Sequence, residues 1–199
     1  MSIEPAPDLT AFVLAGGKSR RMGSDKAFVM FKGQTLLARA LQLAGAISNN
    51  VLIVGDSTRF SPFAPVVEDF FTECGPLGGI HAALRASQTD LNLVLAVDLP
   101  FLSPELLQYL LTQARARHVL VTVPRAGHGL HPLCAIYRRG FAELAESSLR
   151  EGRYKIDALF HSASTNVIEE DVLQAAGFSP LLFQNLNTPE ELSEAQKTV

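Results

Sequence analysis

The sequence predicts a Rossmann-like three-layer α/β/α fold, in which helices cover both faces of a mostly parallel sheet. Strand-like and helix-like segments alternate along the 199 residues, which is the pattern of such folds. The segments 10–14, 51–54 and 93–97 are continuous apolar runs, as expected of strands that are buried on both faces. No internal repeat or linker interrupts the pattern, so we expect one domain over residues 10–199 after a disordered tail at 1–9.

The first half of the chain has clear element boundaries. Residues 35–46 carry apolar side chains at a helical period, and Gly45 stands near the end of that helix. A short strand at 66–67, a helix ending near Ser87 and an amphipathic helix over 103–117 follow. These helices alternate with the strands at 51–54 and 93–97, as the fold class requires.

The second half continues the alternation. We expect a strand at 119–123, a glycine-containing loop at 124–130, and a strand from His131 that leads into a helix over 140–150. Further elements are a helix at 156–161, a strand at 165–168, a helix at 170–176 and a last strand at 181–184. Thr188, Pro189 and Glu191 have the spacing of a capping box at the start of a final helix.

Composition excludes several classes of protein. The formal net charge of −3 provides no general attraction for nucleic acid or an anionic membrane. No apolar run reaches the roughly 18 residues of a membrane span, and the first residues lack the apolar core of a signal peptide. Cys74 and Cys134 are isolated in sequence, which favours free thiols in a reducing compartment. We therefore expect a cytoplasmic protein.

The segment from Leu14 to Lys26 reads LAGGKSRRMGSDK and directly follows the first strand. Adjacent glycines permit a sharp turn with accessible N–H groups, and four cations follow: Lys18, Arg20, Arg21 and Lys26. The segment is not a P-loop, because Phe12 occupies the position of the first glycine, and it lacks the G-x-G-x-x-G spacing. It is either a polyphosphate-binding loop or a solvated basic loop.

Two further motifs stand before helices. Gly75, Gly78 and Gly79 surround Pro76, in a pattern that fits either a tight turn or a helix start approached closely by a ligand. Asp98 follows the most apolar strand, at the strand end where open α/β sheets bind ligands. Ser103 is better placed than Asp98 to cap the next helix, so we interpret Asp98 as a ligand of a hard cation.

The pattern L-A-G-G-x-S-x-R-M-G-x-D-K, with G-P-L-x-G and the C-terminal N-x-N-T-P-E-E-L, resembles the nucleotidyltransferases that build molybdenum cofactors. The chain is most similar to the molybdenum cofactor guanylyltransferase family over nearly its whole length. The resemblance implies a nucleotidyltransferase fold and an enzyme that transfers GMP from GTP to the terminal phosphate of molybdopterin. The reaction would release pyrophosphate and depend on Mg²⁺.

The resemblance also implies roles for particular residues. Arg21 and Lys26 would bind the triphosphate, and Asp98 would hold Mg²⁺. The N–H groups of residues 15–17 would hold the nucleotide. The other implied nucleotide contacts and motif residues are Leu14, Ala15, Gly16, Gly17, Asp69, Gly75 and Gly78. Those implied for the molybdopterin acceptor are Lys155, Asn185 and Asn187, although Lys155 and Asn187 also fit ordinary helix-start and turn positions. Cofactor-synthesis proteins or molybdoenzyme chaperones are possible transient partners.

Two alternatives remain at this stage. Cytidylyl- and sugar-phosphate nucleotidyltransferases share a similar glycine loop, and a non-catalytic GTP-binding module would keep the loop without turnover. A switch GTPase is excluded because the P-loop and the N-K-x-D motif are missing. No residue stands out as a general base, and none is needed if the acceptor is a phosphate that is already ionised.

Overall fold

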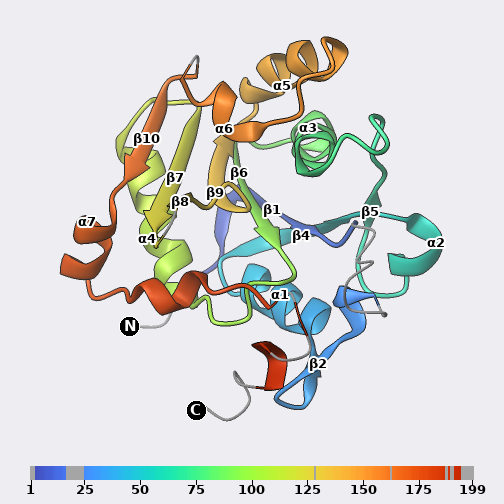
Figure 1. Cartoon of the computed structure of the whole chain (residues 1–199), viewed down its shortest axis with the longest axis vertical. Helices are drawn as coiled ribbons and strands as arrows, with labels where there is room; N and C mark the ends of the chain where they lie inside the picture. Colours follow the sequence, from blue (N-terminus) through green and yellow to red (C-terminus); the bar gives the residue numbers. More distant parts are fainter. Residues whose placement is uncertain are drawn as a thin grey trace.

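A mixed β-sheet forms the centre of the molecule in the computed structural model, which describes residues 3–16, 25–127, 129–161, 163–186, 188 and 191–193. The strands of this sheet are β1 (Ala6–Leu14), β4 (Ser48–Val54), β5 (Val66–Val67), β6 (Leu91–Ala96), β7 (Val121–Ala126), β8 (Gly129–Leu130), β9 (Cys134–Arg138) and β10 (Thr165–Ile168). Their order is β10-β7-β9-β6-β1-β4-β5, and β8 pairs with β7 (Figure 1).

The sheet is mostly parallel, as the sequence predicts. Strand β1 runs parallel to both β4 and β6, β4 is parallel to β5, and β10 is parallel to β7. Only β9 runs antiparallel to its two neighbours in the central path of the described sheet. The shared direction of β1, β4 and β6 brings their carboxyl ends to one edge.

Helices cover both faces of the sheet (Figure 1). One layer contains α1 (Leu36–Gly45), α4 (Pro104–Ala116) and α7 (Glu170–Ala175), and the other contains α3 (Pro76–Ala86), α5 (Phe141–Arg150) and α6 (Ile156–Leu159). Side chains of β1 alternate between the two layers, because successive residues of a strand point to opposite faces. Val13 packs with the first layer, and Phe12 with the second. The predicted three-layer architecture is confirmed.

The helix starts follow the sequence signals. The Thr35 hydroxyl accepts a hydrogen bond from Ala38 N (3.1 Å) and caps α1, while Ser103 accepts from Leu106 N (3.3 Å) and caps α4. Thr188 Oγ1 accepts from Glu191 N, and a Glu191 carboxylate oxygen accepts from Thr188 N. The capping of α4 by Ser103 leaves the Asp98 side chain available for another role.

Smaller elements are η1 (Lys26–Phe28), β2 (Met30–Phe31), β3 (Gln34–Thr35), α2 (Ser57–Phe60) and η2 (Pro180–Phe183).

Several sequence-based boundaries were wrong; the strand expected from His131, for example, begins only at Cys134. Strand β1 begins at Ala6, inside the predicted tail, because Ala6 N donates to Ile47 O (2.8 Å) and Leu9 is fully buried. The expected loop at 124–130 is instead the end of β7 and its hairpin with β8. The expected strand at 181–184 is the 3-10 helix η2, since Ser179 Oγ accepts from Leu181 N and Pro180 opens a turn.

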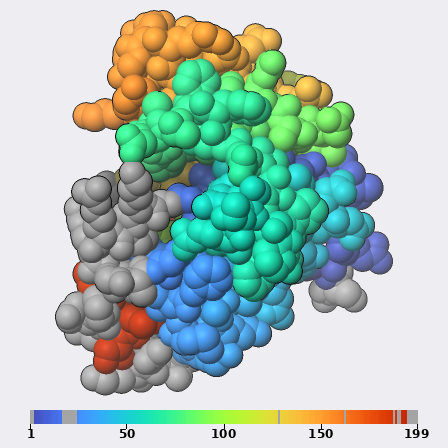
Figure 2. Space-filling view, turned by 90° about the vertical axis from the view of Figure 1, so that its right-hand side faces the viewer, coloured from blue at the N-terminus to red at the C-terminus, as the bar shows by residue number. Residues whose placement is uncertain are grey.

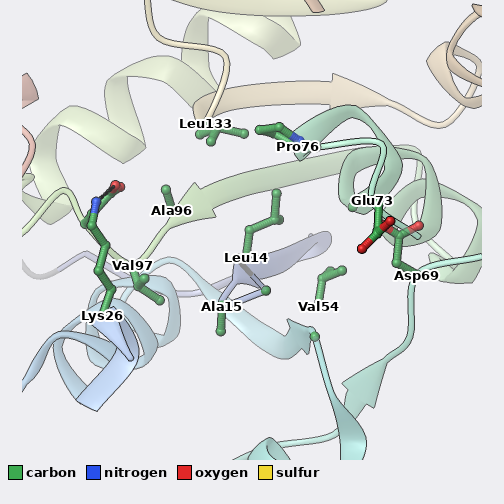
Figure 3. Close-up of a pocket in the computed structure, with 15 residues that line it drawn as sticks. Leu14, Ala15, Lys26, Val54, Asp69, Glu73, Pro76, Ala96, Val97 and Leu133 are labelled. Carbon is green, nitrogen blue, oxygen red and sulfur yellow. Dashed lines mark hydrogen bonds and ion pairs between the residues drawn. The ribbon is translucent and has the colours of Figure 1, made fainter. Parts of the chain in front are cut away.

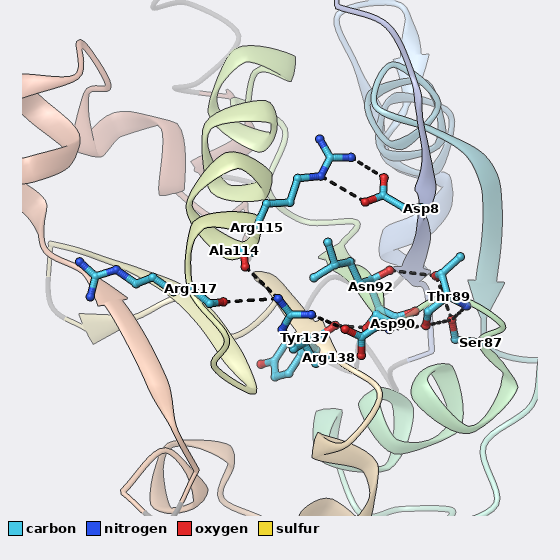
Figure 4. Close-up of polar contacts among 11 residues, drawn as sticks. Asp8, Ser87, Thr89, Asp90, Asn92, Ala114, Arg115, Arg117, Tyr137 and Arg138 are labelled. Atoms are coloured by element: carbon cyan, nitrogen blue, oxygen red, sulfur yellow. Dashed lines mark hydrogen bonds and ion pairs between the residues drawn. The ribbon is translucent and has the colours of Figure 1, made fainter.

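The amino end of β6 is held by a polar network at the edge opposite to the end of β1 (Figure 4). The Asn92 amide donates to Tyr137 O (3.3 Å), and Arg138 pairs with Asp90 while donating to Ala114 O (3.2 Å) at the end of α4. These bonds join β6, β9 and α4 away from the carboxyl edge.

Among the described residues, no helix is both long and apolar enough to cross a bilayer.

Candidate active site

The register of the sheet aligns three strand ends. Leu14, the last residue of β1, pairs with Val54 of β4 on one side and with Ala96 of β6 on the other. The chain leaves β1 toward β4 and β5 and then returns to the other side of β1 to form β6. A crevice at such a reversal of strand order is the usual ligand site of open α/β sheets.

A cavity of about 530 Å³ lies at this edge. The strand ends form its floor, and the segment that leads into α3 forms one wall (Figure 3). The surface is hollowed between that segment and the segment that contains Lys26 (Figure 2). The lining residues are Leu14, Ala15, Gly16, Lys26, Val54, Gly55, Asp69, Glu73, Gly75, Pro76, Gly79, Ala96, Val97, Asp98 and Leu133.

Lys26 and Asp98 meet at one end of the cavity. Asp25 Oδ1 accepts from Ala27 N (3.1 Å) and caps η1, which places Lys26 in its first turn. The Lys26 ammonium donates to Asp98 Oδ2 at 2.8 Å, and the two side chains retain 16% and 22% of their exposure. The predicted phosphate-binding lysine and the predicted metal-binding carboxylate are therefore in direct contact.

Asp69 and Glu73 lie at the other end of the cavity, with the apolar side chains of Leu14 and Val54 between the two ends (Figure 3). Asp69 Oδ1 accepts from Phe71 N at 2.8 Å. Burial raises the pKa of the Asp69 carboxyl, and the bond from Phe71 N partly offsets this rise. The cavity thus has one end with a cation and a carboxylate, an apolar middle, and a second acidic end.

The glycine motif at the start of α3 has two separate functions. Gly75 has φ +68°, a backbone conformation that favours glycine, and it turns the chain into α3 at the wall of the cavity. Gly78 is not among the residues that line the cavity. A Cβ built at Gly78 would lie 2.6 Å from Asp69 Oδ2, so this glycine leaves space for the Asp69 carboxylate.

The glycine loop differs in one respect from the sequence-based expectation. Ala15 and Gly16 line the cavity, but their N–H groups donate to Val54 O at 3.0 and 3.2 Å. These two amides extend the pairing of β1 with β4, so they are not available to hold a nucleotide as predicted. Gly17 and Arg21 lie outside the described residues.

Of the residues implied for the acceptor, Asn185 lies next to the Asp98 segment. Leu186 is fully buried, and its N–H donates to Asp98 O at 3.0 Å, which fixes the backbone that follows the exposed Asn185. Asn187 lies outside the described residues. The C-terminal motif and the strand end that carries Asp98 are therefore directly connected.

Lys155 does not line the cavity at the strand ends. It lies at a second cavity of about 570 Å³, which is also lined by Arg153 and Tyr154. The neighbouring Cys74 side chain raises the pKa of Tyr154. Cys74 stands between Glu73 and Gly75, which line the cavity at the strand ends.

His131, which the sequence left ambiguous, has a structural role. Its Nε2 lies 3.1 Å from Ala126 O, and its ring stacks on Phe183 at a centroid distance of 4.6 Å. Burial lowers the pKa of His131.

Sequence reasoning missed several residues that line the cavity. Glu73 stands only two residues before the glycine motif, but one more acidic residue in an irregular segment carries no distinctive signal. Val54, Gly55 and Leu133 reach the cavity through the strand order, which local sequence does not reveal.

Residues 11–166 match the model of the MobA-like NTP transferase domain family. The chain is 35% identical to a probable molybdenum cofactor guanylyltransferase of Pelotomaculum thermopropionicum, covering 94% of this chain and 91% of the relative. It is 32% identical to a molybdenum cofactor guanylyltransferase of Desulfosudis oleivorans, covering 96% of each.

Among solved structures, molybdopterin-guanine dinucleotide biosynthesis protein A of Archaeoglobus fulgidus superimposes with a TM-score of 0.83 at 27% identity, covering 94% of this chain and 97% of that one. These matches extend over nearly the whole chain, and they agree with the motifs that surround the cavity. The chain therefore belongs to the MobA-like NTP transferase family, in its molybdenum cofactor guanylyltransferase group.

Proposed function

We propose that this protein transfers GMP from GTP to the terminal phosphate of molybdopterin and releases pyrophosphate, with Mg²⁺ as its metal ion. The observation that carries the proposal is the contact between Lys26 and Asp98 at one end of a cavity whose other end is acidic. The names of the relatives, molybdenum cofactor guanylyltransferases, support the choice of substrates.

The two ends of the cavity suit the two ends of a nucleoside triphosphate. The phosphates belong with Lys26 and Asp98, because an ammonium group and a divalent cation held by a carboxylate together neutralise polyphosphate charge. The base then lies toward Asp69, with Leu14 and Val54 beneath the nucleotide. Guanine presents N1–H and N2–H₂ as adjacent donors, which a carboxylate accepts. These donors favour guanine over cytosine, whose pairing edge has a single amino donor.

The residues present fit a Mg²⁺ ion that arrives with the nucleotide. Mg²⁺ is commonly held by one or two carboxylates and the substrate phosphates, and it keeps several waters. Asp98 supplies a partly exposed carboxylate inside the cavity, and the described residues contain no cluster of three or more His, Cys, Asp or Glu side chains for a dedicated metal cage. The ion supplies charge neutralisation on the phosphate oxygens when it is bound.

Lys26 and Arg21 would stabilise the charge that develops on the leaving pyrophosphate. A terminal phosphate oxygen of molybdopterin forms a bond with the α-phosphorus of GTP, and the bond from that phosphorus to the β-phosphate bridging oxygen breaks. The acceptor phosphate has a second pKa of about 6 and is mainly a dianion at neutral pH, so no side chain has to remove a proton. Positioning and charge neutralisation are the tasks left to the protein.

The acceptor belongs on the side of Asp98 where Asn185 precedes the anchored Leu186, and Asn187 is proposed as an acceptor contact from the sequence motif alone. Lys155 is proposed as a contact farther along the acceptor, through the second cavity. Transfer of the product to cofactor-synthesis proteins or molybdoenzyme chaperones remains a prediction.

A pyrophosphate-release assay with molybdopterin tests the choice of nucleotide. GTP, CTP and UTP are compared at equal concentration with Mg²⁺, and we expect turnover with GTP to exceed that with the other two. A preference for CTP would reject guanylyl transfer in favour of the related cytidylyl reaction. Binding of GTP without pyrophosphate release would indicate a non-catalytic module.

The substitution Asp98→Asn tests the metal site. We expect turnover to fall by at least about 100-fold, since charge stabilisation at the reacting phosphate is lost, while the melting temperature stays close to that of the unaltered protein. Glu105→Gln, at an exposed carboxylate on α4, is the matched control and should retain activity. Full activity of Asp98→Asn in Mg²⁺ would remove this residue from the site.

A further inference from the structure

Arg39, on helix α1, contacts the segment that follows Asp98. Arg39 Nη2 donates to Pro100 O at 2.9 Å, and the guanidinium carbon lies 5.2 Å from the ring centroid of the buried Phe31. The Phe31 ring in turn contacts Phe101 edge-on, at a centroid distance of 5.6 Å. Arg39 therefore holds the chain two residues beyond the proposed metal-binding carboxylate.

The same helix also holds the segment that carries Lys26. Leu36 N, at the start of α1, donates to Val29 O at 2.9 Å, directly after η1. One rigid helix thus contacts both partners of the Lys26–Asp98 pair through their neighbouring backbone.

Packing alone does not fix this segment against α1. A cavity of about 260 Å³ lies between them, lined by Leu99 and Pro100 on one side and by Leu36 and Leu43 on the other. Arg39 also lines this cavity, and its bond to Pro100 O spans the gap between helix and segment.

The polar character of Arg39 has a cost that an apolar residue would avoid. Its Nε is buried without a hydrogen-bond partner among the described residues. An unpaired buried donor is unfavourable, and a Leu or Met side chain would pack beside Phe31 without it. The guanidinium therefore contributes through its bond to the Asp98 segment and its contact with the Phe31 ring.

We infer that Arg39 is a positioning residue, which keeps Asp98 at the separation from Lys26 that lets Asp98 hold the divalent cation of a bound nucleoside triphosphate. The inference rests on the proposed function, because it takes a metal–nucleotide complex as the ligand. It assigns a role in metal binding to a residue that does not line the nucleotide cavity.

Titration with Mn²⁺ tests this role without turnover. Free Mn²⁺ is measured by electron paramagnetic resonance in the presence of saturating GTP and no molybdopterin, and binding of a fluorescent GTP analogue is measured in EDTA. Arg39→Met keeps much of the side-chain bulk and removes the donors. We expect it to weaken Mn²⁺ binding about tenfold while leaving metal-free nucleotide binding within about twofold.

Two further variants separate positioning from stability. Arg39→Lys keeps a donor for Pro100 O and should recover most of the Mn²⁺ affinity. Leu37→Ala removes a buried side chain of α1 that does not line the cavity between α1 and the Asp98 segment; it should lower the melting temperature but leave Mn²⁺ affinity unchanged.

Unchanged Mn²⁺ affinity in Arg39→Met would overturn the inference. The inference would also be overturned if Arg39→Met and Leu37→Ala both lost Mn²⁺ affinity in proportion to their loss of melting temperature. Arg39 would then have a purely structural role. If the unaltered protein binds no Mn²⁺ with GTP, the proposed function fails as well, so the two failures are distinguishable.

Discussion

Gly78 illustrates how a single residue position depends on its neighbours. A Cβ at this position would lie 2.6 Å from Asp69 Oδ2 and 2.8 Å from the backbone oxygen of Phe71. Because the backbone oxygen cannot move cheaply, we expect Gly78→Ala to lower the free energy of unfolding by about 1–3 kcal/mol. It should also weaken GTP binding, through displacement of Asp69. Urea denaturation and a GTP titration measure the two effects.

Gly45 is the matched control, since it is also a helical glycine. A Cβ there would have no neighbouring atom within 4 Å, and its φ is not positive. Gly45→Ala should raise the free energy of unfolding by about 0.5–1 kcal/mol, because alanine restricts the unfolded chain. Equal effects of the two substitutions would contradict the assigned role of Gly78.

The lowered pKa of His131 predicts that the free energy of unfolding depends on pH. Burial lowers its pKa in the folded protein, so the unfolded chain binds a proton first as the pH falls through about 6.5. The free energy of unfolding should therefore decrease from about pH 6.5 downward to the lowered pKa, with no contribution of His131 above that range. His131→Phe keeps a ring against Phe183 and should lose less stability than the unaltered protein between pH 7 and pH 5.

Urea denaturation at each pH measures this difference. His118→Asn, at an exposed histidine, is the control and should follow the unaltered protein. An identical pH dependence in His131→Phe would show that other groups account for the loss.

Single residues also show the extent of what sequence can predict. Lys26 and Asp98 were both singled out from their motifs, and both lie at the cavity, Asp98 just after the end of β6 and Lys26 in the first turn of η1. The prediction that the Ala15 and Gly16 N–H groups hold the nucleotide was wrong, because both donate to Val54 O. This acceptor belongs to a strand about 40 residues away. Such a pairing depends on tertiary structure and leaves no trace in the local pattern.

At the scale of elements, Arg138 of β9 completes the end of α4. Its Nη2 donates to Ala114 O at 3.2 Å and to Arg117 O at 3.4 Å, where the last carbonyls of a helix lack partners within the helix. Arg138→Met keeps the apolar stem but removes these donors. We expect a loss of about 1–3 kcal/mol in the free energy of unfolding, measured with urea.

Arg115→Met is the control for this prediction. Arg115 pairs with Asp8 at the surface, and exposed pairs contribute only about 0–1 kcal/mol. If the two variants lose equal stability, the role of Arg138 as a helix cap is wrong.

Element types were more predictable than their ends. The helices predicted to begin at 35 and 103 do so to within a residue, where Thr35 and Ser103 supply local capping bonds. The start of β1 was missed because its first residue is held by Ile47 O, a distant partner, next to two prolines that suggest an irregular tail. For η2, apolar composition favoured a strand, yet Ser179 and Pro180 determine a turn.

At the scale of the whole molecule, the site depends on strand order. Ala15 and Gly16 at the end of β1, the segment before α3 and Asp98 are far apart in sequence, and they meet because β1 lies between β4 and β6. The fold class predicts that strand ends converge, but it does not predict which strands are neighbours. The resemblance of the motifs to a known family was therefore needed to place these segments at one site.

Convergence of these segments on one ligand predicts that GTP and Mg²⁺ stabilise the whole fold. At a ligand concentration of 100 times the dissociation constant, binding adds about 2.7 kcal/mol to the free energy of unfolding. For a chain of 199 residues this corresponds to a rise of about 5–10 °C in melting temperature, measurable by differential scanning fluorimetry. No molybdopterin is added, so the nucleotide is not consumed.

The pattern of this stabilisation distinguishes the two ends of the cavity. ATP should stabilise less than GTP if the acidic end selects the base, since adenine lacks the paired donors of guanine. Asp98→Asn should lose the part of the shift that depends on Mg²⁺ and keep the part due to nucleotide alone. A shift that is equal for both nucleotides and unaffected by Asp98→Asn would mean that GTP stabilises the protein from a different site.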